Sequence, residues 1–191
     1  MIEAPQGLYL VDSGSPGQHL RVLEKMKQLV RRDLKLIWIT HAHYDHYGSA
    51  AALRRLTGAL IGVHPADAES LRAGRSPLGR PRRHGMLFPL VQPLVNLAWR
   101  LPATPPDFML EDGDTLEQFG LPARILHTPG HTPESITLLI SDTTRAEEPW
   151  LALTGDTLFV GDIGRPDLVG VEAARGLANN MYESLFEKIL P

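Results

Sequence analysis

Short apolar runs, each followed by polar or glycine-containing residues, are the main feature of this chain, and they predict buried β-strands. The clearest is Leu34-Lys35-Leu36-Ile37-Trp38-Ile39, a nearly continuous apolar run of the length expected for a buried strand. The strands expected on this basis are 8–11, 34–40 and 60–63, and then about 123–127, 135–141 and 150–154.

Apolar residues at helical spacing predict three helices. The first begins near Gln18 and ends among Arg31 and Arg32, where basic side chains favour the helix dipole. The second is alanine-rich and runs from about 48 to 56, and the third covers 172–189. The apolar faces expected are Leu20, Leu23, Met26 and Val30 for the first helix, and Ala174, Leu177, Met181 and Leu185 for the third. Strands alternating with helices, followed by a strand-rich second half, predict two sheets faced by helices.

Length and composition narrow the class of protein. A chain of 191 residues suffices for one domain, 1–191, with a substantial core. A net charge of −3 gives no attraction to nucleic acid, and the absence of cysteine excludes disulfides, thiolate ligands and thiol nucleophiles. No basic, apolar leader is seen at the start, and no apolar run reaches the ~20 residues that a membrane-spanning helix needs. We therefore expect a cytoplasmic protein without stable membrane insertion. Whether the protein forms a homo-oligomer stays undecided.

The segment 70–106 differs from the rest, because it contains six arginines and no acidic residue. Pro89 and Pro93 interrupt any long helix within it. Three interpretations stay open: a lid-like insertion over a substrate site, an insertion packed on the body of the domain, and a contact surface for a partner or a membrane.

The residues that follow the 34–40 strand are rich in metal ligands, since His41-Ala42-His43-Tyr44-Asp45-His46 contains three imidazoles and a carboxylate. His41 and His43 are two positions apart, so their side chains leave an extended loop on the same side and can bind one ion. Asp45 and His46 are adjacent and diverge, which suits a second ion or a supporting role. A cluster of this kind at a strand end predicts a metal site.

This string resembles the H-x-H-x-D-H signature of the metallo-β-lactamase superfamily, and other stretches fit in the same order. Residues 127–132 are similar to the segment that carries the family's third histidine, here His131. Residues 153–159 are similar to the segment with the bridging aspartate, here Asp156, and residues 11–14 resemble the family's D-T-G turn. The resemblance extends from about 8 to 190 and implies an α/β (α+β) fold, the four-layer αββα sandwich, incomplete at the C-terminus.

The resemblance also implies a chemistry. One ion would be held by His41, His43 and His131, and Asp156 would bridge to a second ion held by Asp45 and His46. The expected cofactor is Zn²⁺, one ion or two, and the nucleophile is a metal-bound hydroxide whose proton Asp45 could steer. The resulting expectation is a metal-dependent hydrolase of a small-molecule thioester, ester or lactone.

Two alternatives to this hydrolase come from the same resemblance. Residues 155–168 are similar to glyoxalase II and to the persulfide dioxygenases, which use a single Fe²⁺ at positions matching His41, His131 and Asp156. Family members usually carry a further histidine at a point that would follow Pro191, and its absence would weaken the second site. The alternatives are therefore a mononuclear iron persulfide dioxygenase and a non-catalytic metal-binding fragment.

Overall fold

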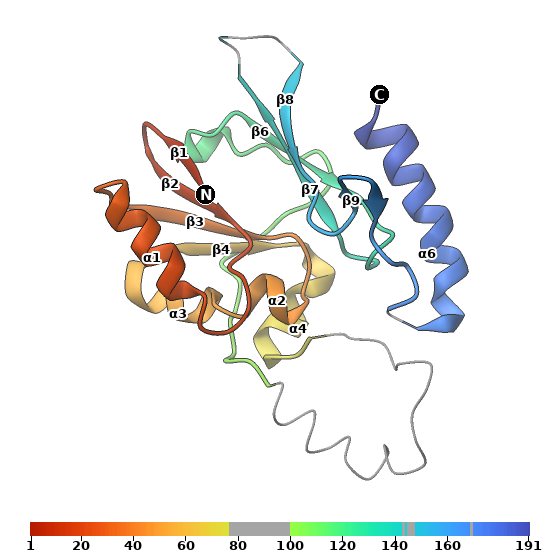
Figure 1. The fold of residues 1–191 in the computed structure, drawn as a ribbon, viewed down its shortest axis with the longest axis horizontal. Helices are drawn as coiled ribbons and strands as arrows, with labels where there is room; N and C mark the ends of the chain where they lie inside the picture. The colour runs from red at the N-terminus through yellow and green to blue at the C-terminus, as the bar shows by residue number, and fades with distance from the viewer. Residues whose placement is uncertain (77–99, 143, 145–147, 169) are drawn as a thin grey trace.

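Two β-sheets lie face to face, and helices cover their outer faces (Figure 1). The structure is a computed structural model, and it describes residues 1–76, 100–142, 144, 148–168 and 170–191. The layers therefore run helix, sheet, sheet, helix, which confirms the predicted sandwich.

The first sheet has five strands in the order β1-β2-β3-β4-β5. The pair β1 and β2 is antiparallel, and the later neighbours are parallel. Parallel pairing brings the carboxyl ends of β2, β3 and β4 to one edge, so the loops that follow these strands lie together. The bounds are β1 Ile2–Ala4, β2 Gly7–Val11, β3 Leu34–Ile39, β4 Leu60–Val63 and β5 Phe108–Met109.

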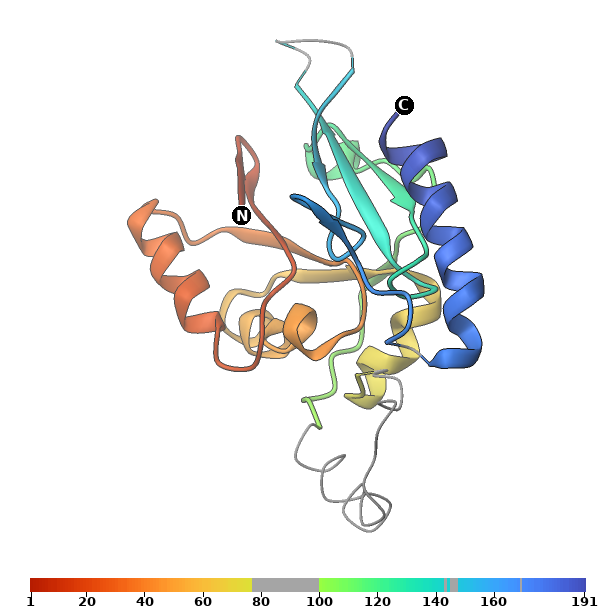
Figure 2. The ribbon, with the colours of Figure 1, turned by 45° about the vertical axis from the view of Figure 1, so that its right-hand side comes forward.

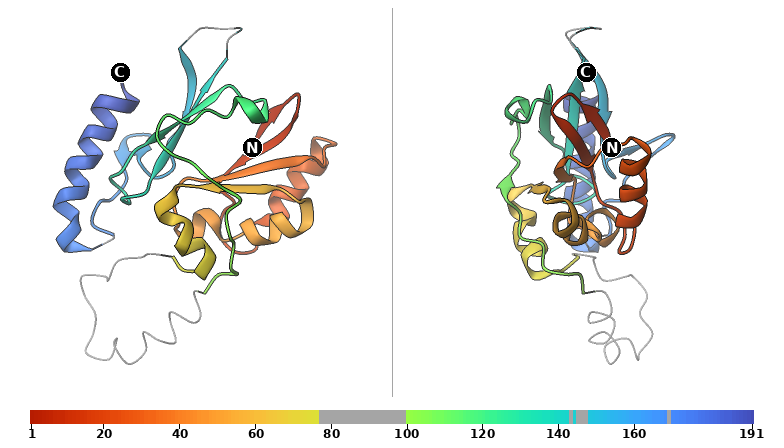
Figure 3. Two further views of the ribbon diagram at one scale, coloured as in Figure 1. Left: turned by 180° about the vertical axis from the view of Figure 1, so that it is seen from behind. Right: turned by 90° about the vertical axis from the view of Figure 1, so that its left-hand side faces the viewer.

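Alternating side chains of this sheet divide between two hydrophobic clusters. Leu8 and Leu10 of β2 pack toward the helical layer, whereas Tyr9 between them packs toward the second sheet. The helical layer contains α1 (His19–Gln28), α2 (Tyr44–Tyr47), α3 (Ala50–Thr57), the 3₁₀ turn η1 (Pro65–Asp67) and α4 (Ala68–Ala73) (Figures 1 and 3).

The second sheet is antiparallel, in the order β6-β7-β8, with bounds Ala123–His127, Ile136–Ser141 and Pro149–Leu153. Its inner face packs on Tyr9 and Trp38, whose rings stack at 5.7 Å, through residues that include Ile125 and Leu138. The short 3₁₀ turn η2 (Glu117–Phe119) precedes it. This shared apolar layer fixes how the two halves of the chain sit on each other.

The last helical layer is α6 (Val171–Glu183), continued by the π-helical turn η3 (Ser184–Ile189), and it runs along the second sheet (Figure 2). This helical stretch buries the side chains of Leu177, Met181 and Leu185, as their spacing predicts. A small hairpin, β9 (Leu158–Phe159) and β10 (Asp162–Ile163), connects β8 to this helix.

The structure corrects the first predicted helix. α1 ends at Gln28, and Val30 has a positive φ of 54°, so the helix stops before Arg31. Leu20 and Val30 are 66% and 90% exposed, so they do not belong to the apolar face. The buried side instead comprises Met26 with the partly buried Val22, Leu23 and Leu29.

Most of the predicted 70–106 insertion lies outside the described residues, which leave out 77–99. Its described flanks pack on the sandwich: Leu101 is buried, its N–H donates to the Gly74 carbonyl, and the Thr104 N–H donates to the Leu71 carbonyl. The lid stays a prediction. In the described parts of the chain, every helix is too short or too polar to cross a bilayer.

Candidate metal centre

Candidate metal ligands from four segments of the chain converge at one place in the fold. His41 and His43 follow β3, and His46 lies on α2 directly after them. His131 comes from the turn between β6 and β7, and Asp156 precedes the β9–β10 hairpin. Residues that are up to 115 positions apart are thus brought together by the packing of one sheet on the other.

The first group is His41, His43 and His131, all buried. The Nδ1 atom of His43 lies 2.9 Å from His41 Nε2 and 3.1 Å from His131 Nε2. Each imidazole offers one nitrogen to the group, and these nitrogens all lie within 4.8 Å of one another. This arrangement offers three nitrogen ligands to a metal ion, and three protein ligands leave a coordination position for another group.

Hydrogen bonds on the far side of the rings orient two of these imidazoles. His41 Nδ1 lies 3.1 Å from the Thr40 hydroxyl, and His131 Nδ1 lies 3.2 Å from the Arg165 carbonyl. A carbonyl can only accept, so His131 carries its proton on Nδ1 and turns the lone pair of Nε2 toward the group. His43 Nδ1 faces the nitrogens of both other rings and is therefore its candidate ligand atom, whereas His43 Nε2 is buried without a hydrogen-bond partner among the described residues.

The second group consists of His41, His46 and Asp156. His46 Nε2 lies 3.3 Å from Asp156 Oδ1, and His131 Nε2 lies 3.5 Å from Asp156 Oδ2. One carboxylate thus faces an imidazole of each group, which is the position a bridging ligand needs. Asp156 is more open than the first group, with 27% of its side chain exposed.

Asp12 is a supporting residue whose role sequence reasoning did not identify. Its carboxylate accepts from the Thr40 N–H at 2.8 Å, from the Thr40 hydroxyl at 2.9 Å and from His46 Nδ1 at 2.7 Å. Asp12 has a positive φ of 54°, which is uncommon for a residue other than glycine. The D-S-G turn was the only signal of it in the sequence, since the partners lie 28 and 34 residues away.

Burial keeps the imidazoles of the first group neutral. It lowers the pKa of His41 well below its usual value, and with His131 and His46 nearby it lowers the pKa of His43 to about 4. Burial also lowers the pKa of His131, against the opposing charge of Asp156. Metal ions bind neutral imidazole, so these side chains are ready to ligate at neutral pH without losing a proton.

His46 and Asp156, the two members that only the second group contains, have the opposite electrostatics. Burial alone would lower the pKa of His46, but hydrogen bonds to Asp12 and Asp156 raise it to about 10. Burial would raise the pKa of Asp156, but the hydrogen bond from His46 and the charge of His46 lower it. Without a metal, His46 and Asp156 therefore form an ion pair, and an ion entering there must displace a proton.

Asp45 lies apart from both groups, although sequence reasoning placed it among the ligands. It is exposed, on the first turn of α2, and its carboxylate belongs to neither set of converging atoms. Its charge still raises the pKa of His43 and of His131, so it faces the site. The structure brings together His41, His43, His46, His131 and Asp156, and it places Asp45 at their rim.

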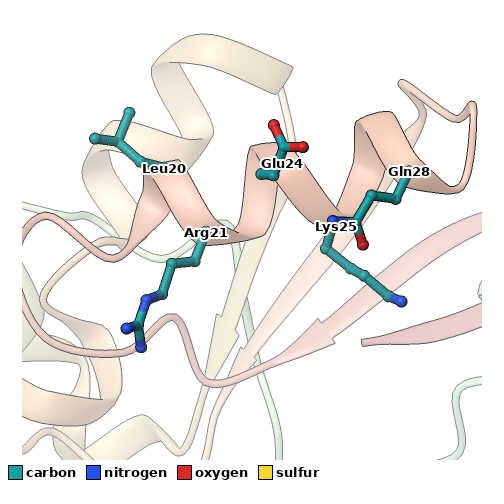
Figure 4. Close-up of a pocket in the computed structure, with 5 residues that line it drawn as sticks. All are labelled: Leu20, Arg21, Glu24, Lys25 and Gln28. Carbon is teal, nitrogen blue, oxygen red and sulfur yellow. The ribbon is translucent and has the colours of Figure 1, made fainter.

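Two other surface features lie outside this centre. His64 and His127, at the ends of β4 and β6, stack with ring centroids 4.5 Å apart. A shallow hollow of about 420 Å³ lies along α1, and its lining side chains all come from that helix (Figure 4). That hollow shares no residue with the histidine groups.

Comparison with known proteins shows which family the chain belongs to. The model of the metallo-β-lactamase superfamily matches residues 1–190. Hydroxyacylglutathione hydrolase GloC of Haemophilus influenzae is 30% identical over 186 residues, covering 95% of this chain and 73% of that protein. The probable metallo-hydrolase YqgX of Bacillus subtilis is 28% identical over 181 residues, covering 95% and 72%.

Solved structures agree on the fold. FEZ-1 metallo-β-lactamase of Legionella gormanii superposes with a TM-score of 0.71 at 18% identity, covering 96% of this chain and 66% of that one. BLEG-1, a B3 metallo-β-lactamase, gives 0.69 at 24% identity, covering 100% and 78%. The chain thus spans about two thirds to four fifths of these four proteins. With its sandwich and its histidine-rich potential metal site, it belongs to the metallo-β-lactamase superfamily.

Proposed function

We propose that this chain is a metal-dependent hydrolase of a thioester, ester or lactone, with zinc as its metal. The observation that carries the proposal is the convergence of three buried imidazole nitrogens that burial keeps neutral. Burying three polar rings against each other costs free energy unless their nitrogens have a bonding partner. A divalent ion is a partner that the lone pairs of all three nitrogens can bind at once.

Each side chain has a role in this proposal. His41, His43 and His131 hold the first ion, and Thr40 and the Arg165 carbonyl keep two of these rings in the correct orientation. Asp156 faces both groups and, together with His46, would help to hold a second ion. Asp45, exposed at the rim, steers a proton or completes the second position as its side chain turns.

A divalent ion in the first group would supply Lewis acidity, lowering the pKa of a bound water from 15.7 to about 7 and stabilising negative charge on a substrate oxygen. The protein's contribution is geometric and electrostatic. The three imidazoles bring no charge, and the carboxylates of Asp156 and Asp12 supply the negative charge that a divalent ion requires.

The second position is the weaker one. Filling it breaks the ion pair between His46 and Asp156 and releases the His46 proton, whereas the first group needs no proton release near pH 7. We therefore expect one tightly bound zinc ion and a second that binds less tightly and competes with protons.

The substrate class is supported by the relatives. GloC is named as a hydrolase of hydroxyacylglutathione, which is a thioester, and YqgX as a probable metallo-hydrolase. A thioester is accordingly the first substrate to test, with an aryl ester and a lactone as the other members of the class.

The test compares the wild type with His131→Ala and with a control, His19→Ala, which changes a histidine at the start of α1 outside both groups. Metal content, hydrolysis of a hydroxyacyl glutathione thioester, an aryl ester and a lactone, and oxygen uptake on a persulfide are measured for each. We expect bound zinc and hydrolysis in the wild type and the control, with turnover reduced at least a hundredfold in His131→Ala.

Two results would contradict the proposal in different ways. One bound iron with oxygen uptake and no hydrolysis would establish the persulfide dioxygenase instead. Bound metal without turnover on any substrate would indicate a non-catalytic metal-binding protein.

A further inference from the structure

A second carboxyl group lies behind the candidate ligands and belongs to neither group. Asp67 ends the turn η1 between β4 and α4, and only 2% of it is exposed. Aspartate is almost never fully buried unless it is paired. Among the described residues, however, no lysine, arginine or histidine forms an ion pair with Asp67, so its burial needs another explanation.

The hydrogen bonding of Asp67 points to the ligand loop. Its Oδ2 atom accepts from the N–H of Ala42 at 2.9 Å. Ala42 is fully buried and lies between His41 and His43. The bond therefore fixes the peptide plane between the two histidines whose ring nitrogens converge, and it reaches that plane because β3 and β4 are parallel neighbours.

Asp67 completes a pair of anchors on this loop. Asp12 accepts from the N–H of Thr40, and Asp67 accepts from the N–H of Ala42, two residues further on. Asp12 follows β2 and Asp67 ends η1, which comes after β4, so the two carboxylates hold alternate amides of one stretch from the two strands that flank β3. His41 lies between these two amides and His43 follows the second, so a shift of this backbone would move both imidazole rings.

The charge at this position also favours a cation. Burial, with the nearby carboxyl of Glu134, raises the pKa of Asp67 to about 7. Glu134 lies in the turn that carries His131, so acidic groups approach the ligand loop from both halves of the molecule. A pKa of about 7 leaves the Asp67 carboxyl partly protonated in the metal-free protein at neutral pH, and a divalent ion in front of it would favour the charged form.

We propose that Asp67 is a positioning residue of the metal centre: through Ala42 it holds His41 and His43 in ligating geometry, and its negative charge strengthens binding of the cation. This inference rests on one part of the proposed function, namely that His41, His43 and His131 bind a metal ion. Asp67 itself touches neither metal nor substrate.

The test measures zinc affinity of the folded protein by competition with a chromophoric chelator, together with the melting temperature of the metal-free form. The variants are Asp67→Ala, which removes both bond and charge, and Asp67→Asn, which keeps an acceptor and removes the charge. The control is Glu69→Gln on α4, whose side chain is 73% exposed and pairs only loosely with Arg75, at 3.7 Å. The control removes one negative charge two residues further along the chain, at an exposed position.

We expect zinc affinity to fall about 10- to 100-fold in Asp67→Ala, as for other groups that support a metal ligand. Asp67→Asn should lose a smaller part, and Glu69→Gln should match the wild type. Zinc affinity within twofold of the wild type in the folded Asp67→Asn and Asp67→Ala proteins, with only their metal-free melting temperatures lowered, would overturn the inference. If Asp67→Ala does not fold, Asp67→Asn decides alone: unchanged affinity overturns the inference.

This experiment separates two failures. A wild type that binds zinc but hydrolyses nothing would refute the proposed function and leave the role of Asp67 standing. A wild type that hydrolyses a thioester, with Asp67 variants of unchanged zinc affinity, would refute the role of Asp67 alone.

Discussion

Single side chains in this centre differ sharply in charge although they are neighbours. His41 and His46 have ring centroids 4.0 Å apart, yet burial keeps the first neutral while carboxylates keep the second protonated. The ligand string itself was visible in the sequence. The difference between its members was not, because it depends on Asp12 and Asp156, which reach His46 only through the fold.

The protonated His46 predicts how the metal-free protein responds to pH. Its folded pKa of about 10 lies above the ordinary 6.5, so its stabilisation is complete below pH 6.5 and is lost as pH rises toward 10. After removal of metal with a chelator, the free energy of unfolding measured with urea should be about 1.5–3 kcal/mol lower at pH 9.5 than at pH 6. This difference is the typical contribution of hydrogen bonds to charged groups. His46→Gln should show a clearly smaller difference, whereas an identical pH dependence in this variant would refute the ion pair.

At the level of elements, apolar runs predicted the six described strands of four residues or more, because a buried strand needs a continuous apolar stretch. The two- and three-residue strands β1, β5, β9 and β10 were not predicted, since they are too short to form such a run. β3, β4 and β6 lie within one residue of their predicted bounds. Helix ends were predicted less well, since the stop of α1 depends on the left-handed conformation of Val30, which composition does not signal. The ligand string was expected to be an extended loop, but it becomes helical at Tyr44, and this turn carries Asp45 away from His41 and His43.

The β9–β10 hairpin is held against the centre by a glycine with no room for a side chain. A Cβ on Gly164 would lie 1.7 Å from the Asp156 carbonyl oxygen and 2.9 Å from the His131 Cβ. Gly164→Ala should therefore displace both candidate ligands and reduce zinc affinity at least tenfold. The control is Gly176→Ala in the middle of α6, where nothing lies within 4 Å, and it should gain about 0.5–1 kcal/mol of stability with unchanged affinity. Equal zinc affinities in the two variants would contradict this account of the hairpin.

At the scale of the whole molecule, the sandwich could be predicted from the order of strands and helices and from the resemblance to the metallo-β-lactamase superfamily. The geometry of the candidate site depends instead on how the two halves of the chain pack. His41 and His43 belong to the first half, and His131 and Asp156 to the second, so an ion at the centre joins the two sheets. The sequence could not give this geometry, because the packing of Tyr9 and Trp38 against Ile125 and Leu138 sets it.

An ion that joins the halves should stabilise the entire fold. Zinc at a hundredfold its dissociation constant should add about 2.7 kcal/mol to the free energy of unfolding and raise the melting temperature accordingly. Differential scanning calorimetry should show this rise in the wild type and in His19→Ala, and should show little of it in His131→Ala. A rise of equal size in His131→Ala would mean that zinc binds elsewhere.

The central claim is that a metal held by His41, His43 and His131 enables hydrolysis, and a stepwise zinc titration of chelator-treated protein tests it most directly. Bound zinc and the rate of thioester hydrolysis are measured on the same samples. We predict no turnover without metal and a rate that rises in proportion to the first equivalent, with further change as a second, weaker ion binds at higher pH. Hydrolysis that persists without metal, or zinc that binds to two equivalents without any turnover on thioester, ester or lactone, would contradict the account.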